Sequence, residues 1–347
     1  MKKDIRTLDK FRPVEYAICS VMTLAILLFC VCIGSVNIPL RDTAIAIWNT
    51  VFNLPIPEGI AQPIIVAMRL PRVICVALVG ASLSLCGASM QGLLRNPLAD
   101  GSTLGVSAGA SLGAVIAIAF GITLPGLPFA GTMVMAILFA FLSLIIILSL
   151  AYKLDYSLST NTIILIGIVF SMFVASIISV IMTFSQDRIR TITFWTMGSL
   201  AGSNFQNALL LLIALIVFGG ILLAHGRELN AFAIGEDNAR HVGVNVKKVK
   251  LTTMITMSVL IGVCVSIGGT IGFVGLIIPH ITRMVTGPNH KRLMPASMFM
   301  GAIFLMLADL IARVIARPME IPIGVVTSFI GAIVFIYIFY MTRKFRK

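Results

Sequence analysis

Two arginines and no lysine stand at the start of a long apolar run, in the segment RLPR from Arg69 to Arg72. The arginine guanidinium is a planar fork that binds a carboxylate through two parallel hydrogen bonds, which a lysine ammonium cannot do. Such a pair could therefore recognise acidic groups on a partner. The alternative is that both arginines only anchor the run at the lipid headgroup layer, with their apolar stems buried and their charges in water.

Asp309 is the one carboxylate deep within an apolar run, and Arg313 lies four residues on, on the same face of a helix. A charged side chain inside a membrane is energetically costly, so it usually indicates a functional role, such as a proton relay. A single acid with a basic partner within reach is more simply explained as a structural ion pair. Arg317 and Glu320 could form a second pair of this kind.

Signatures of enzymes are missing from the sequence, which contains no HExxH, no GxSxG elbow and no GxxxxGK[ST] loop. His280 and His290 fit polar residues at helix ends better than metal ligands. The six cysteines fall in apolar runs without metal-ligand spacing, as small buried side chains do. We therefore predict no metal site, no cofactor bound by this chain and no enzymatic activity.

Membrane-spanning helices must position these groups. Of the 347 residues, 59% are hydrophobic and 11% are charged, whereas a soluble domain carries about 25% charged residues. The mean hydropathy is +1.05, and apolar runs long enough to cross about 30 Å of hydrocarbon as helices recur from end to end. The basic residues, which give a net charge of +13, form short clusters between these runs, so topology explains them better than nucleic acid does.

The pattern predicts an all-α polytopic membrane protein, a single transmembrane domain over residues 1–347, with about ten transmembrane helices. We interpret the first run as a retained span because it is long and lacks a clear cleavage site. The eighth run is short and contains Pro279, but lysine clusters on both sides of the seventh and eighth runs require the chain to cross twice between them. The expected spans are 14–36, 70–92, 104–121, 130–152, 161–183, 207–225, 251–269, 272–286, 294–313 and 322–341.

Ten crossings place both termini in the cytoplasm, and every lysine then lies inside, while the external basic residues are arginines only. The polar segment 185–206 is expected outside as a short surface or re-entrant helix. Small residues recur through the spans and predict close helix packing. A weak echo between MQGLLRNP (90–97) and FVGLIIPH (273–280) hints at two inverted five-helix halves.

The cytoplasmic loop 226–250 is longer than a plain connection requires. It predicts two short helices separated by a glycine turn, with an acidic start to the second helix and a second glycine at its end. Apolar residues retained on an exposed loop indicate a partner surface. The residues concerned are Phe232, Ile234, Gly235, Glu236, Asp237, Arg240 and Gly243.

Several blocks together resemble the FecCD family, the membrane subunits of bacterial type II ATP-binding-cassette importers for ferric siderophores, haem and cobalamin. The resemblance covers nearly the whole chain, and the combination of the second block with the fourth is its most specific part. The blocks are RLPR (69–72), GASLSLCGASMQGLLRNPLADGSTLGVSAGASLGA (80–114), IGEDNARHVGV (234–244), GFVGLIIPHITR (272–283) and EIPIGVVTSFIGAIVF (320–335).

The resemblance implies a ten-helix permease in the bacterial cytoplasmic membrane that pairs with a second FecCD-type permease, identical or related. The translocation path would lie between the two, with an extracytoplasmic binding protein above and two cytoplasmic ATPases, which hold ATP and Mg²⁺, below. Ferric siderophore is the first expected cargo, with haem and cobalamin as alternatives. An ion-gradient-driven carrier is the alternative of another class, but Asp309 alone supports it poorly.

The resemblance also implies roles for individual residues. Arg69, Arg72 and Arg313 match external arginines that dock the binding protein. The loop matches the element that seats in the ATPase, with Glu236, Asp237 and Arg240 as polar contacts and Phe232 and Ile234 as apolar ones. Thr160 and Asn161 match a narrow cytoplasmic gate of small hydroxyl residues, where Thr160 is kept and Asn161 departs, so the gate size stays open.

Overall fold

The computed structural model of the protein describes residues 10–34, 38–51, 63–101, 104–123, 130–156 and 159–344, and its regular elements in these ranges are all helices. The long helices are α1 (Pro13–Cys32), α3 (Leu70–Leu93), α5 (Ala130–Leu154), α6 (Thr160–Phe184), α12 (Val246–Gly268), α14 (His290–Val314) and α15 (Ile323–Lys344). The shorter ones are α2 (Leu40–Val51), α4 (Val106–Phe120), α7 (Ile189–Thr196), α8 (Phe205–Ala214), α9 (Gly220–Ala224), α10 (Gly226–Ala233), α11 (Glu236–His241) and α13 (Val274–Thr286). Two π-helical segments, Pro63–Arg69 and Leu215–Gly219, lead into α3 and α9.

The predicted spans are confirmed within the described ranges. Seven helices are long and apolar enough to cross a membrane, and three shorter apolar helices, Val106–Phe120, Val274–Thr286 and Ile323–Ile338, occupy the remaining predicted positions. Residues 35 and 36, at the end of the first predicted span, lie outside the described ranges. The split of the seventh and eighth runs is also confirmed, because α12 ends at Gly268 and α13 begins at Val274.

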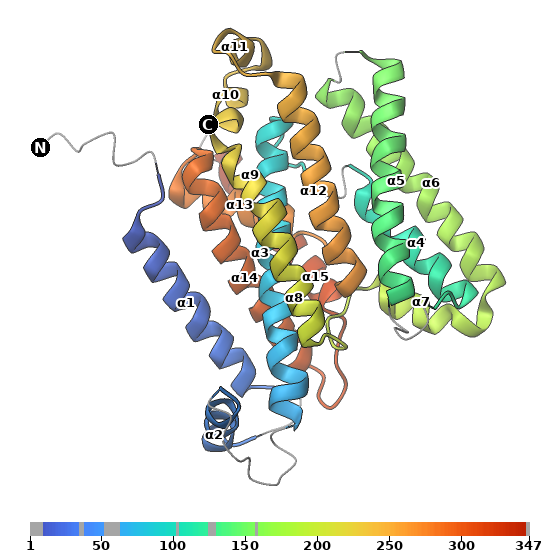
Figure 1. Cartoon of the computed structure of the whole chain (residues 1–347), viewed down its shortest axis with the longest axis vertical. Helices are drawn as coiled ribbons and strands as arrows, with labels where there is room; N and C mark the ends of the chain where they lie inside the picture. The colour runs from blue at the N-terminus through green and yellow to red at the C-terminus, as the bar shows by residue number, and fades with distance from the viewer. Residues whose placement is uncertain are drawn as a thin grey trace, which may run out of the picture.

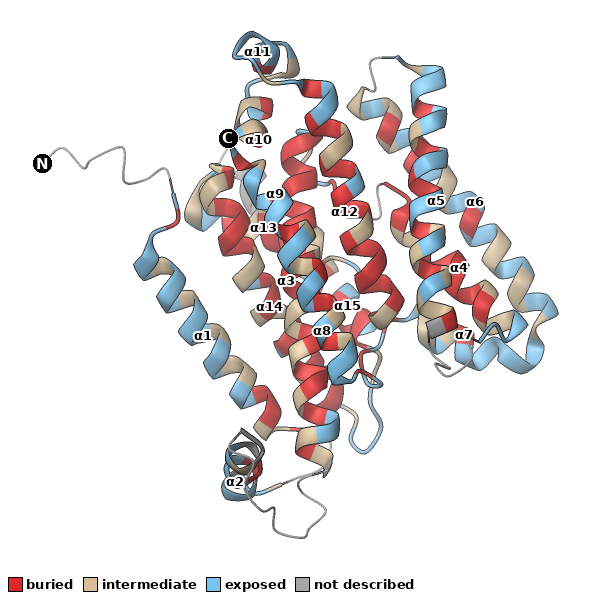
Figure 2. Ribbon diagram, in the orientation of Figure 1, coloured by how far each residue is buried: buried red, intermediate tan, exposed pale blue. Residues whose placement is uncertain are grey.

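The helix α3 forms the centre of the bundle, and the apolar surface of the outer helices faces away from it. About four fifths of the α3 span is buried (78%), against 11% of the α1 span and 17% of the α6 span. Figure 2 shows this contrast, with α3 largely red and α1 largely blue or tan. Since water would not tolerate so much exposed apolar surface, lipid or partner subunits must cover α1 and α6.

Glycines let α3 approach its neighbours at backbone distance. A Cβ at Gly87 would overlap the carbonyl of Gly275 in α13, and one at Gly80 would overlap the carbonyl of Gly301 in α14. Small residues are what permit such contacts between membrane helices. The two segments with similar sequences, 90–97 and 273–280, are in contact: Gln91 Nε2 donates a hydrogen bond to the carbonyl of Leu276 at 2.9 Å.

The two ends of the bundle carry different elements. Figure 1 shows α10 and α11 at one end, and α2 and α7 toward the other. The segment 185–206 contains the predicted short helix, α7, while the amphipathic helix α2 was not predicted. The loop 226–250 forms the two predicted short helices, α10 and α11.

Candidate functional site

A groove of about 690 Å³ lies on one flank of the bundle. Its lining is largely apolar, with three serines, one threonine and one aspartate as the polar members. It is formed by parts of α3, α4, α6, α12, α13 and α15; among its lining residues are Cys86, Ser107, Ser171, Ile261, Leu276 and Ser328. Such a surface can hold a bulky ligand with few fixed charges, whereas a bare ion needs rings of coordinating groups.

The non-helical segment between α12 and α13 lies along this groove. Thr270, Ile271, Gly272 and Phe273 all line it, and Phe273 has a left-handed φ of +67°. Irregular backbone at membrane depth is stable only where protein buries it or a cavity exposes it to water. The interruption between α12 and α13 therefore lies where such backbone is tolerated, beside a groove in the helix bundle.

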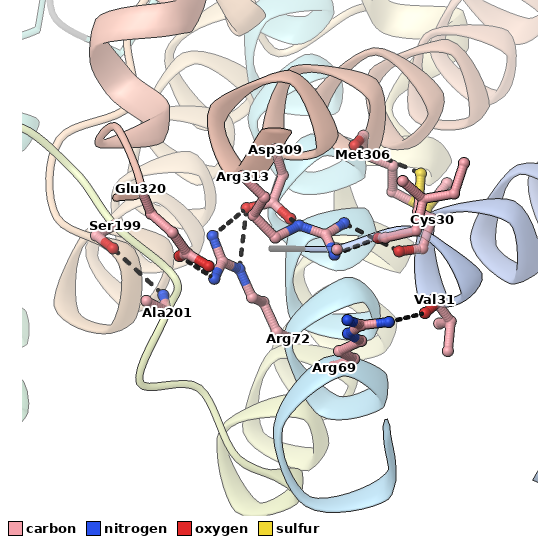
Figure 3. Close-up of polar contacts among 12 residues, drawn as sticks. Cys30, Val31, Arg69, Arg72, Ser199, Ala201, Met306, Asp309, Arg313 and Glu320 are labelled. Carbon is pink, nitrogen blue, oxygen red and sulfur yellow. Dashed lines mark hydrogen bonds and ion pairs between the residues drawn. The ribbon is translucent and has the colours of Figure 1, made fainter. Parts of the chain in front are cut away.

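A buried ion-pair cluster ties α3 to α14 near the other end of the bundle (Figure 3). Arg72 Nε and Nη2 donate to Asp309 Oδ1 at 3.1 and 2.8 Å, and Arg72 Nη1 donates to Glu320 Oε2 at 2.6 Å. Arg313 Nε lies 2.9 Å from Asp309 Oδ2 as an ion pair outside hydrogen-bond geometry. The predicted pair of Asp309 with Arg313 is confirmed. Arg72, which is 237 residues from Asp309 in the sequence, also binds Asp309. Glu320 was expected to pair with Arg317, but it binds Arg72 instead.

The carbonyls at the C-terminal end of α1 accept from three arginines. Arg313 donates to Ile33 and Cys30 at 2.9 and 3.0 Å, Arg317 donates to Gly34 at 2.6 Å, and Arg69 donates to Val31 and Cys32 at 3.3 and 3.4 Å. These carbonyls have no partner within the helix, and cations are favoured at the negative end of its dipole. These three arginines therefore anchor the C-terminal end of α1, and the Glu15–Arg292 ion pair holds its first turn.

The three arginines predicted to dock the binding protein, Arg69, Arg72 and Arg313, are buried in this chain. Their exposed fractions are 6%, 8% and 2%, because the two carboxylates and the end of α1 supply partners inside the protein. Their role in docking a binding protein stays a prediction. The binding protein would have to contact guanidinium groups that have little exposed surface.

The element α10–α11 presents a smaller apolar surface than expected. Phe232 is fully buried in the core, so the prediction that it forms an exposed contact is wrong, whereas Ile234 is exposed. The side chains of Asp237 and Arg240 are exposed and lie 3.6 Å apart as an ion pair. Gly235 and Gly243 have φ of +117° and +86°, values that a side chain rarely permits, at the predicted turn and stop.

Two sets of polar contacts that the sequence did not predict fix α10–α11 to the transmembrane helices. Glu236 binds the buried Lys250 of α12 at 2.6 Å. Asn230 of α10 donates to Asn289 Oδ1 at 2.8 Å, and Asn230 Oδ1 accepts from the backbone N–H of His290 at 2.8 Å. Because Asn230 Oδ1 is also 2.9 Å from His290 Nδ1 and can only accept there, this ring nitrogen carries the proton.

Of the two predicted gate residues, Thr160 lies beside α11. Thr160 begins α6, and it lines a pocket of about 570 Å³ together with Arg95, Gly235, Glu236 and Arg240. Asn161 is exposed and does not line this pocket. The structure thus brings Thr160 next to α11, which sequence spacing could not show.

Comparisons with known proteins agree with this architecture. The model of the FecCD transport family matches residues 22–341. The chain is 41% identical over 304 residues to the uncharacterized ABC transporter permease protein YvrB of Bacillus subtilis, which covers 87% of this chain and 86% of that protein. It is 39% identical over 283 residues to the cobalamin import system permease protein BtuC of Halobacterium salinarum, covering 82% and 74% of the two chains.

A solved structure shows the same fold. It is described as a metal-chelate type ABC transporter in an inward-facing conformation, is 30% identical to this chain and covers 95% of this chain and all of that chain, with a TM-score of 0.83. The family match and the relatives both span most of the sequence. The protein is a multi-pass membrane permease of the FecCD transport family, and so a subunit of an ABC importer.

Proposed function

We propose that this permease moves a ferric siderophore or a related metal chelate into the cytoplasm by alternating access. The groove carries this proposal, because its lining is apolar and hydroxylated and its volume of about 690 Å³ fits a bulky ligand. In a chelate the organic ligand already coordinates the metal ion. Its transport path therefore needs a large, largely apolar surface and no side chains that coordinate the metal.

Relatives named for other cargoes define the alternatives. Besides cobalamin, their names include molybdate, iron(3+)-hydroxamate and hemin. Haem or cobalamin import is therefore the second candidate. A gradient-driven carrier has lost its single support, because Asp309 is paired with Arg72 and Arg313.

The groove on one chain would form half of a path that a second FecCD-type permease completes. The helices beside it, α6 and α15, carry exposed apolar side chains that a partner could cover, among them Met172, Phe173, Phe329 and Ile333. The energy would come from two separate ATPases that bind ATP and Mg²⁺, and α10–α11 would seat in them through Ile234, Asp237 and Arg240. A binding protein would deliver cargo at the opposite end, next to Arg69 and Arg72, and both termini would lie in the cytoplasm.

Uptake measurements test the cargo and the energy source together. Cells with and without this chain receive labelled ferric siderophores, haem or cobalamin, with ATP depleted while the proton gradient is held. We expect chain-dependent uptake of an iron chelate that stops when ATP is lost. Chain-dependent uptake of haem or cobalamin alone would overturn the siderophore assignment, and uptake that follows the gradient would overturn the ATP-driven mechanism.

A further inference from the structure

A second pocket, of about 310 Å³, lies where the beginnings of α1, α10 and α14 meet. Three of its lining residues are cations, Lys10, Arg227 and Lys291, each from a different one of these segments. The other lining residues are Phe11, Tyr16, Leu223, Ala224, His290 and Pro295. This pocket is separate from the transport groove and from the pocket beside α11, with which it shares no lining residue.

The positive charge of this pocket is uncompensated within the described part of the chain. None of the described residues that line it is a carboxylate, and Lys10, Arg227 and Lys291 form no ion pair with a described residue. The nearby Glu15 is already engaged by Arg292 at 2.5 Å. The positive dipole ends of α1, α10 and α14 add to the same field, so the pocket attracts anions.

The walls of the pocket are held rigidly enough to define a site. The rings of Phe11 and Tyr16 lie 4.7 Å apart edge to face, and both pack on Phe299 of α14, with centroid distances of 6.5 and 6.3 Å. Gly226 lies against the backbone of Lys291, where an added Cβ would be 3.6 Å from its nitrogen. The cations from α10 and α14 are therefore neighbours, and the aromatic contacts fix the segment that carries Lys10.

The surface next to the pocket is apolar and exposed. Val14, Ile18 and Val21 of α1 are 66%, 54% and 67% exposed, and Ile221 and Leu223 of α9 are also exposed. Apolar side chains thus continue from the pocket along the outside of the bundle, while Tyr16 lies at the boundary, where aromatic residues are enriched. An anionic group bound by the cations would have its apolar portion beside these helices.

We propose that this pocket binds the phosphate headgroup of an anionic phospholipid, with the acyl chains along α1 and α9. Basic pockets between helices at the cytoplasmic side of a membrane are the sites where such headgroups bind. Free phosphate shares the headgroup chemistry, but it would make no use of the adjoining apolar surface.

The test uses the full chain in nanodiscs of phosphatidylcholine containing a minor fraction of phosphatidylglycerol, with the lipid that stays bound measured by native mass spectrometry. The wild type is expected to retain phosphatidylglycerol selectively. The variant Arg227→Gln/Lys291→Gln is expected to bind it about 30-fold more weakly, from about 1 kcal/mol for each cation near the surface. The charge-conserving variant Arg227→Lys/Lys291→Arg should keep most of the selectivity, and it shows that the pocket still folds.

The matched control is Lys153→Gln/Lys248→Gln, which removes two exposed cations at the same end of the bundle but outside the pocket. Equal loss of phosphatidylglycerol in this control, or no selectivity in the wild type, would overturn the site. Displacement of the lipid by millimolar inorganic phosphate would reassign it to free phosphate. Unchanged lipid binding by the pocket variant, with loss of ATPase subunits, would reassign it to a protein partner.

Discussion

Asp309 Oδ1 accepts two hydrogen bonds from the guanidinium of Arg72, and both side chains are more than nine-tenths buried. This contact joins the central helix α3 to α14 at the end where Arg313 and Arg317 also hold α1. Two acids, Asp309 and Glu320, balance Arg72 and Arg313, so the cluster satisfies charges that would be costly alone.

Asp309→Ala should destabilise the protein strongly. Removing one member of a buried pair leaves a charge without compensation and costs about 3–5 kcal/mol. Thermal unfolding in detergent, followed by size-exclusion chromatography, measures the loss. Glu15→Gln is the control, because the Glu15–Arg292 pair is partly exposed and its loss should cost no more than about 1 kcal/mol. Equal effects of the two substitutions would contradict the structural role of the cluster.

Arg69→Lys tests docking separately from anchoring. Lysine keeps the positive charge but cannot form the two parallel hydrogen bonds that a guanidinium makes to a carboxylate. If Arg69 docks through a carboxylate, the affinity for the binding protein should fall at least about tenfold, which corresponds to roughly 1.4 kcal/mol. Surface plasmon resonance with the binding protein gives the affinity, and thermal unfolding reports the contact with α1. Arg190→Lys on the exposed helix α7 is the control. Unchanged affinity with a lower Tm would leave Arg69 as an anchor of α1 only.

Hydropathy and charge were sufficient to predict the transmembrane helices, since lipid requires every span to be a long apolar helix. The split before α13 followed from the lysines on both sides of it. The helix α2 was missed because its twelve residues are too few and too polar for that signal.

Side-chain partners were harder to predict. Arg72 and Asp309 are far apart in sequence, and only the packing of α3 on α14 joins them.

The helices α10 and α11 show the same difference between local and tertiary features. The glycines and acids of α11 predicted its turn, start and end, because these depend on local backbone geometry. The burial of Phe232 depends on where α10 packs, which composition does not reveal. The contacts of Asn230 were missed for the same reason, since asparagine in a polar loop usually has only water as a partner.

Gly87→Ala should disrupt the centre of the bundle. The new Cβ would overlap the carbonyl of Gly275, so α3 and α13 must separate, at a cost of about 1–3 kcal/mol for overpacking. Gly220→Ala is the control, since nothing lies within 4 Å of its Cβ position and alanine favours a helix by up to about 1 kcal/mol. Thermal unfolding of both variants checks the prediction. Equal or higher stability of Gly87→Ala would contradict the close contact.

Asn230→Ala should weaken the connection between α10 and α14. It removes the acceptor for the His290 N–H and Nδ1–H and the donor to Asn289, each worth about 0.5–1.5 kcal/mol. We expect assembly with the ATPases to persist, while the number of ATP molecules hydrolysed per cargo rises several-fold. Asn238→Ala is the control, because among the described residues its amide donates only to the carbonyl of Ile234, four residues earlier. An unchanged ratio would show that Asn230 only stabilises α10.

Ser171→Trp should block transport through the groove. Ser171 lines the groove from α6, and an indole there would occupy much of the space between α6 and α13. Ser176→Trp is the matched control, because Ser176 makes the same hydroxyl contact to the carbonyl four residues earlier but does not line the groove. Cargo uptake by reconstituted transporter should fall more than about tenfold for the first variant and little for the second, with ATPase assembly kept in both. Such a loss corresponds to roughly 1.4 kcal/mol or more of added barrier. Equal uptake by the two variants would show that the cargo does not pass this surface.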